Sequence, residues 1–328
     1  MKIAVEKQTP VTALATLIAI VAASYTRYGT APFENEEVSA RVVPPLAEYL
    51  SAFGASHPVV SIIAAAIMTI AAGMIIGIMV SRFNIYPTQT FISMPLYGVV
   101  ACGIFISRDA LSAALSSLLA AMAVRYLVCG YLRERDLSSM LYSGLAVGTM
   151  LLVSPSGAAY AVAVMIAVFV LSFSARELLV LMTAAVFPPA VFCYAVWAFG
   201  GEFAAPAIRI REALISESGV ATFGNDAVAA LVLCGLTAFT FVSSAVLFQA
   251  NRFMVSVKSR GILIYILLLS LLSAAMMFLP SSTPAALAVA AVPMSMIMPV
   301  VFIREGERLS AILYLSSAVV FVLHLLYY

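Results

Sequence analysis

Long hydrophobic blocks alternate with short polar segments along the whole chain. Each block holds about 16 to 24 residues, close to the roughly 20 that an α-helix needs to cross the hydrocarbon core of a bilayer. The pattern predicts an all-α, polytopic bundle of eleven transmembrane helices, forming a single membrane domain over residues 1–328. The expected spans are 10–26, 58–80, 90–107, 110–131, 139–154, 157–174, 178–199, 226–249, 261–279, 284–303 and 309–327.

The positive charges between the blocks predict an orientation. Cytoplasmic loops of membrane proteins are enriched in lysine and arginine. With a cytoplasmic N-terminus, all but five of the 17 lysines and arginines fall on the cytoplasmic side, and the odd number of spans places the C-terminus outside. The five on the outer side are Arg27, Arg41, Arg108, Arg209 and Arg211.

Two features leave the span count open. The turn at residues 154–157 links two short blocks, so residues 139–174 form either two full crossings or a re-entrant hairpin. Lys2 and Lys7 precede the apolar run 11–23, as in a signal peptide. Because Glu6 weakens this basic start, we expect the run to stay as the first span.

The composition excludes a soluble protein. Hydrophobic residues make up 64% of the chain and charged residues 10%, compared with roughly 45–50% and 25% in soluble domains. The net charge of +2 is not gathered into a basic stripe, which argues against nucleic-acid binding. His57 and His324 lie far apart and the four cysteines are isolated, so neither residue type shows metal-ligand spacing and no metal-binding residue is assigned.

Glycines and prolines inside the blocks predict helix contacts and helix breaks. Gly73 and Gly77, like Gly144 and Gly148, have the four-residue spacing that lets two transmembrane helices approach closely. Prolines remove a backbone donor, and we expect each to kink its helix. Those inside blocks are Pro95, Pro188, Pro189, Pro293 and Pro299.

Broken helices can line transport sites, whereas ion relays normally place ionisable side chains at mid-depth. Arg125 and His324 lie near the ends of their blocks instead. The sequence therefore argues against ion-coupled transport.

The long outer segments, at about 27–57 and 200–225, predict two surface helices. Leu46, Tyr49, Leu50 and Phe53 recur at helical spacing between a proline pair and a glycine, which predicts an amphipathic helix on the outer membrane surface. A second helix is expected to begin near Pro206 and to end before Gly219.

Acidic and basic residues share this outer face. A carboxylate there would serve as general base or hold a metal, and arginines would bind a diphosphate through paired hydrogen bonds. The alternative is that these side chains are ordinary solvated loop charges. The catalytic candidates are Glu34, Glu36, Glu37 and Asp109, and the substrate-binding candidates are Arg41, Arg108, Arg209 and Arg211.

Several short motifs lie between His57 and Gly200. They are His57-Pro58, Ser81-Arg82-Phe83-Asn84, Met94-Pro95-Leu96-Tyr97, and the paired short helices before Ser174-Ala175-Arg176-Glu177-Leu178. In these motifs the chain resembles a family of uncharacterised polytopic inner-membrane proteins of the Bacteroidota. The resemblance implies a bacterial inner membrane and no particular activity.

The order of the first outer loop, with acidic residues from Glu34 followed by a surface helix to Phe53, is similar to that of membrane-embedded glycosyltransferases that use isoprenoid-linked sugars. This likeness implies a catalytic carboxylate among Glu34, Glu36 and Glu37. The loop departs from those enzymes because it contains no aspartate.

Three functions are consistent with these observations. The first is an enzyme of envelope biogenesis that acts on a lipid-linked saccharide or phospholipid at the outer leaflet. The second, ranked almost level, is a non-catalytic subunit of an envelope or secretion complex with a membrane-protein partner. The third is a transporter or lipid flippase, suggested by the proline-broken spans.

Overall fold

The computed structural model describes residues 9–29, 43–86, 89–103, 110–132, 136–171, 174–215, 227–250, 256–276, 284–304 and 307–327. Within these ranges the chain forms helices joined by short connections, without a β-strand, which confirms the prediction of an all-α protein. Seven helices are long and apolar enough to cross a membrane, and α1, α4 and α6 are shorter apolar helices. The chain is therefore a multi-pass helical membrane protein.

The helices follow the predicted blocks closely. In chain order they are α1 (Pro10–Gly29), α2 (Pro45–Ser56), α3 (Pro58–Arg82), α4 (Ser93–Gly103), α5 (Ala110–Leu132), α6 (Leu137–Val153), α7 (Gly157–Val170), α8 (Ala175–Ala198), α9 (Ala205–Ile215), α10 (Ala227–Ala250), α11 (Val257–Met276), α12 (Pro284–Ile297), α13 (Pro299–Arg304) and α14 (Glu307–Tyr327). Both predicted surface segments are helical, as α2 and α9.

Two expected spans differ from the structure. Helix α4 begins at Ser93, so Pro95 lies in its first turn, where a missing N–H removes no helical hydrogen bond. The expectation that Pro95 kinks its helix was therefore wrong. The span expected at 284–303 consists of two helices, because α12 ends at Ile297 and α13 begins at Pro299.

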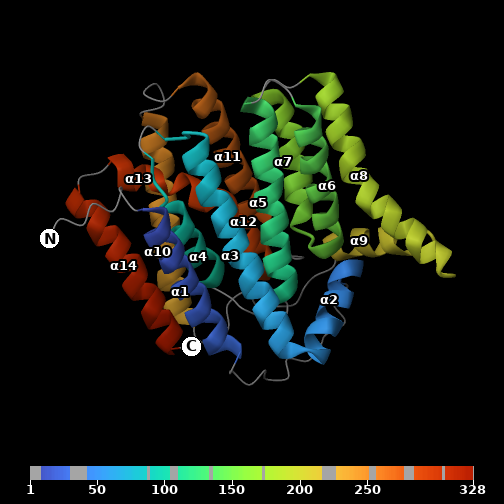
Figure 1. Cartoon of the computed structure of the whole chain (residues 1–328), viewed down its shortest axis with the longest axis horizontal. Coiled ribbons are helices and arrows are strands. Elements are labelled where there is room, and N and C mark those ends of the chain that lie inside the picture. The colour runs from blue at the N-terminus through green and yellow to red at the C-terminus, as the bar shows by residue number, and fades with distance from the viewer. Residues whose placement is uncertain are drawn as a thin grey trace.

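Helix α12 forms the centre of the bundle. It packs against α4, α5 and α11, with further contacts to α3 and α10, and 89% of the window Ala286–Ile303 is buried. Helices α10, α13 and α14 pack together at one edge, and α5, α6 and α8 pack in that order at the other (Figure 1). Most of the apolar surface of α12 is thus covered by protein rather than lipid.

One end of the bundle, the lower end in Figure 1, carries α2, α9 and the C-terminal end of α8, and we call it the α2–α9 end. Helices α6 and α7 meet there through a buried turn in which the hydroxyls of Ser154 and Ser156 lie 2.7 Å apart. Helix α6 is about 26 Å long and α7 about 21 Å, shorter than the ~30 Å hydrocarbon core. Whether residues 139–174 form two crossings or a re-entrant hairpin stays a prediction.

Glycines bring α6 and α8 into close contact. A Cβ atom on Gly144 would overlap the carbonyl oxygen of Leu181, and one on Gly148 would overlap that of Ala185. The first glycine pair packs against side chains instead, since a Cβ on Gly73 would meet Leu17 of α1, and one on Gly77 would meet Met94 of α4. Close helix packing at both pairs confirms the prediction from their spacing.

Candidate functional site

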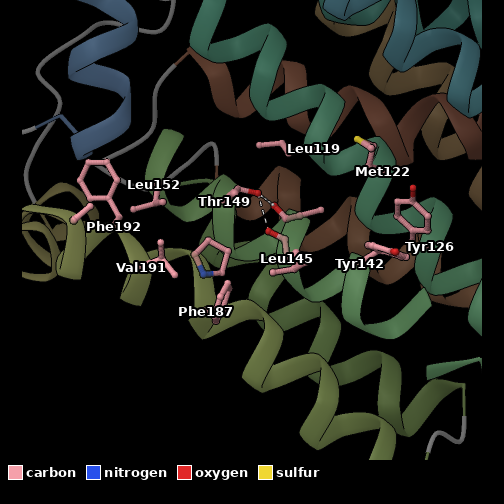
Figure 2. A pocket seen from close by; sticks show the side chains of 13 residues that line it. Leu119, Met122, Tyr126, Tyr142, Leu145, Thr149, Leu152, Phe187, Val191 and Phe192 are labelled. Atoms are coloured by element: carbon pink, nitrogen blue, oxygen red, sulfur yellow. Dashed lines mark hydrogen bonds between the residues drawn. The ribbon is translucent and has the colours of Figure 1, made fainter. Parts of the chain in front are cut away.

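An apolar groove of about 580 Å³ lies between α5, α6 and α8. Figure 2 shows its lining side chains, with Tyr126 and Tyr142 at one end, Thr149 and Leu145 in the middle, and Phe192 and Leu152 at the other end. The lining consists of Leu119, Met122 and Tyr126 from α5, Tyr142, Leu145, Ala146, Thr149 and Leu152 from α6, and Phe187, Pro188, Val191, Phe192 and Ala195 from α8.

The groove exists because α8 leaves α6 beyond its proline pair. Its N-terminal half is held against α6 at Gly144 and Gly148, and its C-terminal half slants away from the bundle (Figure 1). Pro189 lacks the N–H that would bond to the carbonyl of Ala185, and this carbonyl faces the bare backbone of Gly148. Two lining residues, Phe187 just before the proline pair and Val191 just after it, are exposed.

The middle of the groove provides no free polar group. Thr149 is its central polar residue, and its hydroxyl donates to the carbonyls of Leu145 and Ala146 at 2.7 and 3.0 Å. Side chains such as Leu119 and Phe187 surround it. Such a lining suits a hydrocarbon chain better than a polar metabolite.

Aromatic and cationic side chains mark the end of the groove remote from α2. The rings of Tyr126 and Tyr142 are tilted, with their centroids 5.2 Å apart. The guanidinium carbon of Arg125 lies 6.0 Å from the centroid of the Tyr126 ring, within range of a cation–π interaction. This end therefore combines aromatic surface with a positive charge.

Helix α2 lies at the other end of the groove. Its Tyr49 ring meets the ring of Phe192, a groove residue, edge-on with centroids 6.5 Å apart. At the preceding position, Glu48 forms an ion pair with Arg209 of α9. The two side chains are 58% and 52% exposed, so the pair contributes about 0.2–1 kcal/mol and serves mainly to align the two helices.

The structure describes only two of the charged residues that the sequence selects as site candidates, Arg209 and Arg211. Arg209 pairs with Glu48, a residue that the sequence analysis did not select as a candidate, and Arg211 is exposed on α9. Neither arginine lines the groove. The remaining candidates, Glu34, Glu36, Glu37, Arg41, Arg108 and Asp109, lie outside the described residues. Their convergence on one site stays a prediction.

At the second proline break, a hydroxyl group of a neighbouring helix bonds to the backbone carbonyl that the proline leaves without a helical donor. Pro293 cannot bond to the carbonyl of Val289, and the hydroxyl of Tyr160 on α7 donates to that carbonyl at 3.3 Å. Partners of this kind allow a broken helix to remain stable inside a membrane protein. The freed carbonyl is thus used in packing rather than left for a ligand.

Backbone groups at the junction of α12 and α13 also have hydrogen-bond partners on neighbouring elements. Ser244 of α10 donates to the carbonyl of Met298 at 2.8 Å and accepts from the amide of Val301 at 3.4 Å. Tyr86, between α3 and α4, donates to the carbonyl of Met296. Burial raises the pKa of Tyr86 well above its ordinary range, so the phenol keeps the proton that it donates.

Comparison with known proteins gave no relative from which a role could be transferred: no protein-family model, curated protein or solved structure matches the chain.

Proposed function

We propose that the protein crosses the bacterial inner membrane eleven times and acts on a lipid-linked saccharide or phospholipid at the outer leaflet during envelope biogenesis. In this arrangement α2 and α9 lie on the outer surface, α12 and α13 together form one span, and each other helix crosses once. The N-terminus is cytoplasmic and the C-terminus is outside, as the lysine and arginine distribution favours. Exposure of Tyr49 and Phe53 on α2 supports an interfacial position.

The groove between α5, α6 and α8 is the observation that carries this proposal. It is apolar, it opens sideways where lipid would surround the bundle, and it ends beside α2. Along α6 it extends over residues 142–152, about 15 Å at a rise of 1.5 Å per residue. This is about half of the ~30 Å hydrocarbon core, so the groove accommodates the chain of a lipid from one leaflet.

A lipid whose chain occupies the groove would have its headgroup at the α2–α9 end. Arg209, Arg211 and the loop that carries Glu34, Glu36 and Glu37 belong to that side in the proposed orientation. Arginines there would bind the phosphate, and one glutamate would accept a proton from the attacking group. The similarity to isoprenoid-dependent glycosyltransferases supports the same roles.

A lipid flippase is the second candidate, because the groove reaches Pro188 at the break in α8. The hydroxyl partners at the α12 and α13 breaks argue against a second, ion-binding site in the described part of the core. A non-catalytic subunit is the third candidate, and it predicts a stable membrane-protein partner after purification in mild detergent.

Filling the groove should prevent lipid binding. We expect Thr149→Trp to reduce labelling by a phospholipid with a photoreactive acyl chain about tenfold, equivalent to ~1.4 kcal/mol of binding free energy. The indole would occupy the space in which Thr149 now lies centrally. Labelling is measured by mass spectrometry of peptides from α5, α6 and α8.

Thr149→Val is the matched control, since it keeps the size of the side chain and removes only a hydroxyl that is satisfied within α6. It should label like the wild-type protein. Equal labelling of the tryptophan and valine variants would exclude the groove as the lipid site.

Removal of the loop carboxylates tests the catalytic part separately. We expect the combined change of Glu34, Glu36 and Glu37 to glutamine to abolish complementation of a gene deletion while leaving lipid labelling in the groove intact. A general base contributes about 10²–10⁴-fold to a rate. Full complementation by the triple variant would contradict the enzymatic function, and the flippase and subunit functions would remain as candidates.

A further inference from the structure

Arg125 is a cation within a transmembrane helix. It precedes Leu132, the last residue of α5, by seven positions, which places it about 10 Å from the helix end. Its side chain is half-buried next to Tyr126, which is part of the groove lining. Charged side chains at such depth are costly and commonly mark a binding site.

Within the described part of the chain, no carboxylate compensates this charge. The ion pair found there joins Glu48 and Arg209 at the α2–α9 end, and the neighbour of Arg125 is the ring of Tyr126 at 6.0 Å. Neither the Tyr126 nor the Tyr142 hydroxyl has a hydrogen-bond partner among the described residues. A guanidinium and two phenols thus provide several hydrogen-bond donors that are available to an acceptor.

The surroundings of these donors fit a lipid phosphate. The guanidinium can form two parallel hydrogen bonds to phosphate oxygens, and a long arginine side chain reaches toward the headgroup level from about this depth. Leu141 and Tyr142 on α6 are 42% and 51% exposed, and they offer apolar surface to acyl chains. Basic pockets between transmembrane helices bind anionic lipids in this manner.

We propose that Arg125, Tyr126 and Tyr142 form a binding site for the phosphate of an anionic phospholipid, drawn from the leaflet opposite the α2–α9 end. The lipid's acyl chains lie along the exposed side chains of Leu141 and Tyr142. This site requires that α5 crosses the membrane but does not depend on the enzymatic function proposed above.

Native mass spectrometry of the full-length protein in detergent tests the site, with phosphatidylglycerol and phosphatidylcholine as probes. We expect the wild-type protein to bind phosphatidylglycerol more tightly than phosphatidylcholine. Arg125→Gln should weaken phosphatidylglycerol binding about tenfold, the loss expected for a charge-assisted hydrogen bond. Phosphatidylcholine binding should change little.

Arg82→Gln is the matched control because it removes the same charge from an exposed position in the last turn of α3, outside both proposed sites. This variant should bind phosphatidylglycerol more tightly than phosphatidylcholine, as the wild-type protein does. The proposal would be overturned if both variants lost phosphatidylglycerol affinity equally, or if Arg125→Gln bound phosphatidylglycerol as tightly as the wild-type protein.

Two milder variants cover the case in which Arg125→Gln does not fold. Arg125→Lys keeps the charge but loses the paired donors, and Tyr142→Phe keeps the ring but loses the hydroxyl. Each should weaken phosphatidylglycerol binding about two- to tenfold, the range for one hydrogen bond. Wild-type affinity in both variants would also overturn the site.

Discussion

A Gly148→Ala variant is expected to unfold at a lower temperature than the wild-type protein. Its free energy of unfolding should fall by about 1–3 kcal/mol, near the upper end of that range. The new methyl group would overlap the carbonyl oxygen of Ala185, a backbone atom that cannot move without displacing α8. Thermal unfolding of the purified protein in detergent measures the effect. The same displacement should widen the groove at Pro188, since that residue also adjoins Gly148.

Gly235→Ala is the control for this substitution. Gly235 is also a helical glycine, on α10, but a Cβ atom there meets nothing within 4 Å. Alanine is favoured over glycine within a helix by up to about 1 kcal/mol, so this variant should be as stable as the wild-type protein or slightly more stable. Matching melting temperatures for Gly148→Ala and Gly235→Ala would contradict the close contact between α6 and α8.

A Tyr160→Phe variant should lose about 1–3 kcal/mol of stability, the cost of leaving a buried acceptor unpaired. The substitution keeps the ring but removes the hydroxyl that donates to the carbonyl of Val289. Because residue 293 is proline, no helical N–H can take its place. Water is scarce in the core of a membrane protein, so the carbonyl has no alternative donor there. The shift is measured as a change in melting temperature.

Tyr97→Phe removes an equally buried tyrosine hydroxyl, on α4, without that consequence. Tyr97 donates to Ser117, whose hydroxyl already donates to the carbonyl of Ala114. The expected loss is about 0.5–1.5 kcal/mol, that of an ordinary hydrogen bond. A larger loss in Tyr97→Phe than in Tyr160→Phe would show that Tyr160 does not compensate for Pro293.

The helices were predictable because membrane spans depend on local composition. An apolar run of sufficient length forms a helix wherever it lies in the bundle, and the spacing of Leu46, Tyr49, Leu50 and Phe53 was enough to identify α2. Pro95 was misjudged because the apolar block begins before the helix does: Ile92 precedes the first turn of α4 yet is fully buried.

The groove was not predicted, since it depends on which faces of α5, α6 and α8 meet. Phe187 and Tyr142 are indistinguishable in sequence from other lipid-facing residues, and the residues it recruits are up to 76 positions apart, from Leu119 to Ala195. Two signals were present, the proline pair at 188–189 and the glycine spacing at 144 and 148. The sequence does not show that the two glycines of α6 pack against α8 next to its proline pair, and the groove could not be predicted without that contact.

The central position of α12 has a consequence for biogenesis. Helices enter the membrane in the order of their synthesis, and α12 follows α3, α4 and α5 by more than 150 residues. Until it arrives, the hydroxyls of Tyr86 and Tyr160 lack their carbonyl acceptors on α12. A nascent chain that stops before residue 284 therefore lacks the carbonyl groups that accept these two hydrogen bonds, so the partners of α3 to α7 are completed only after α12 has been made.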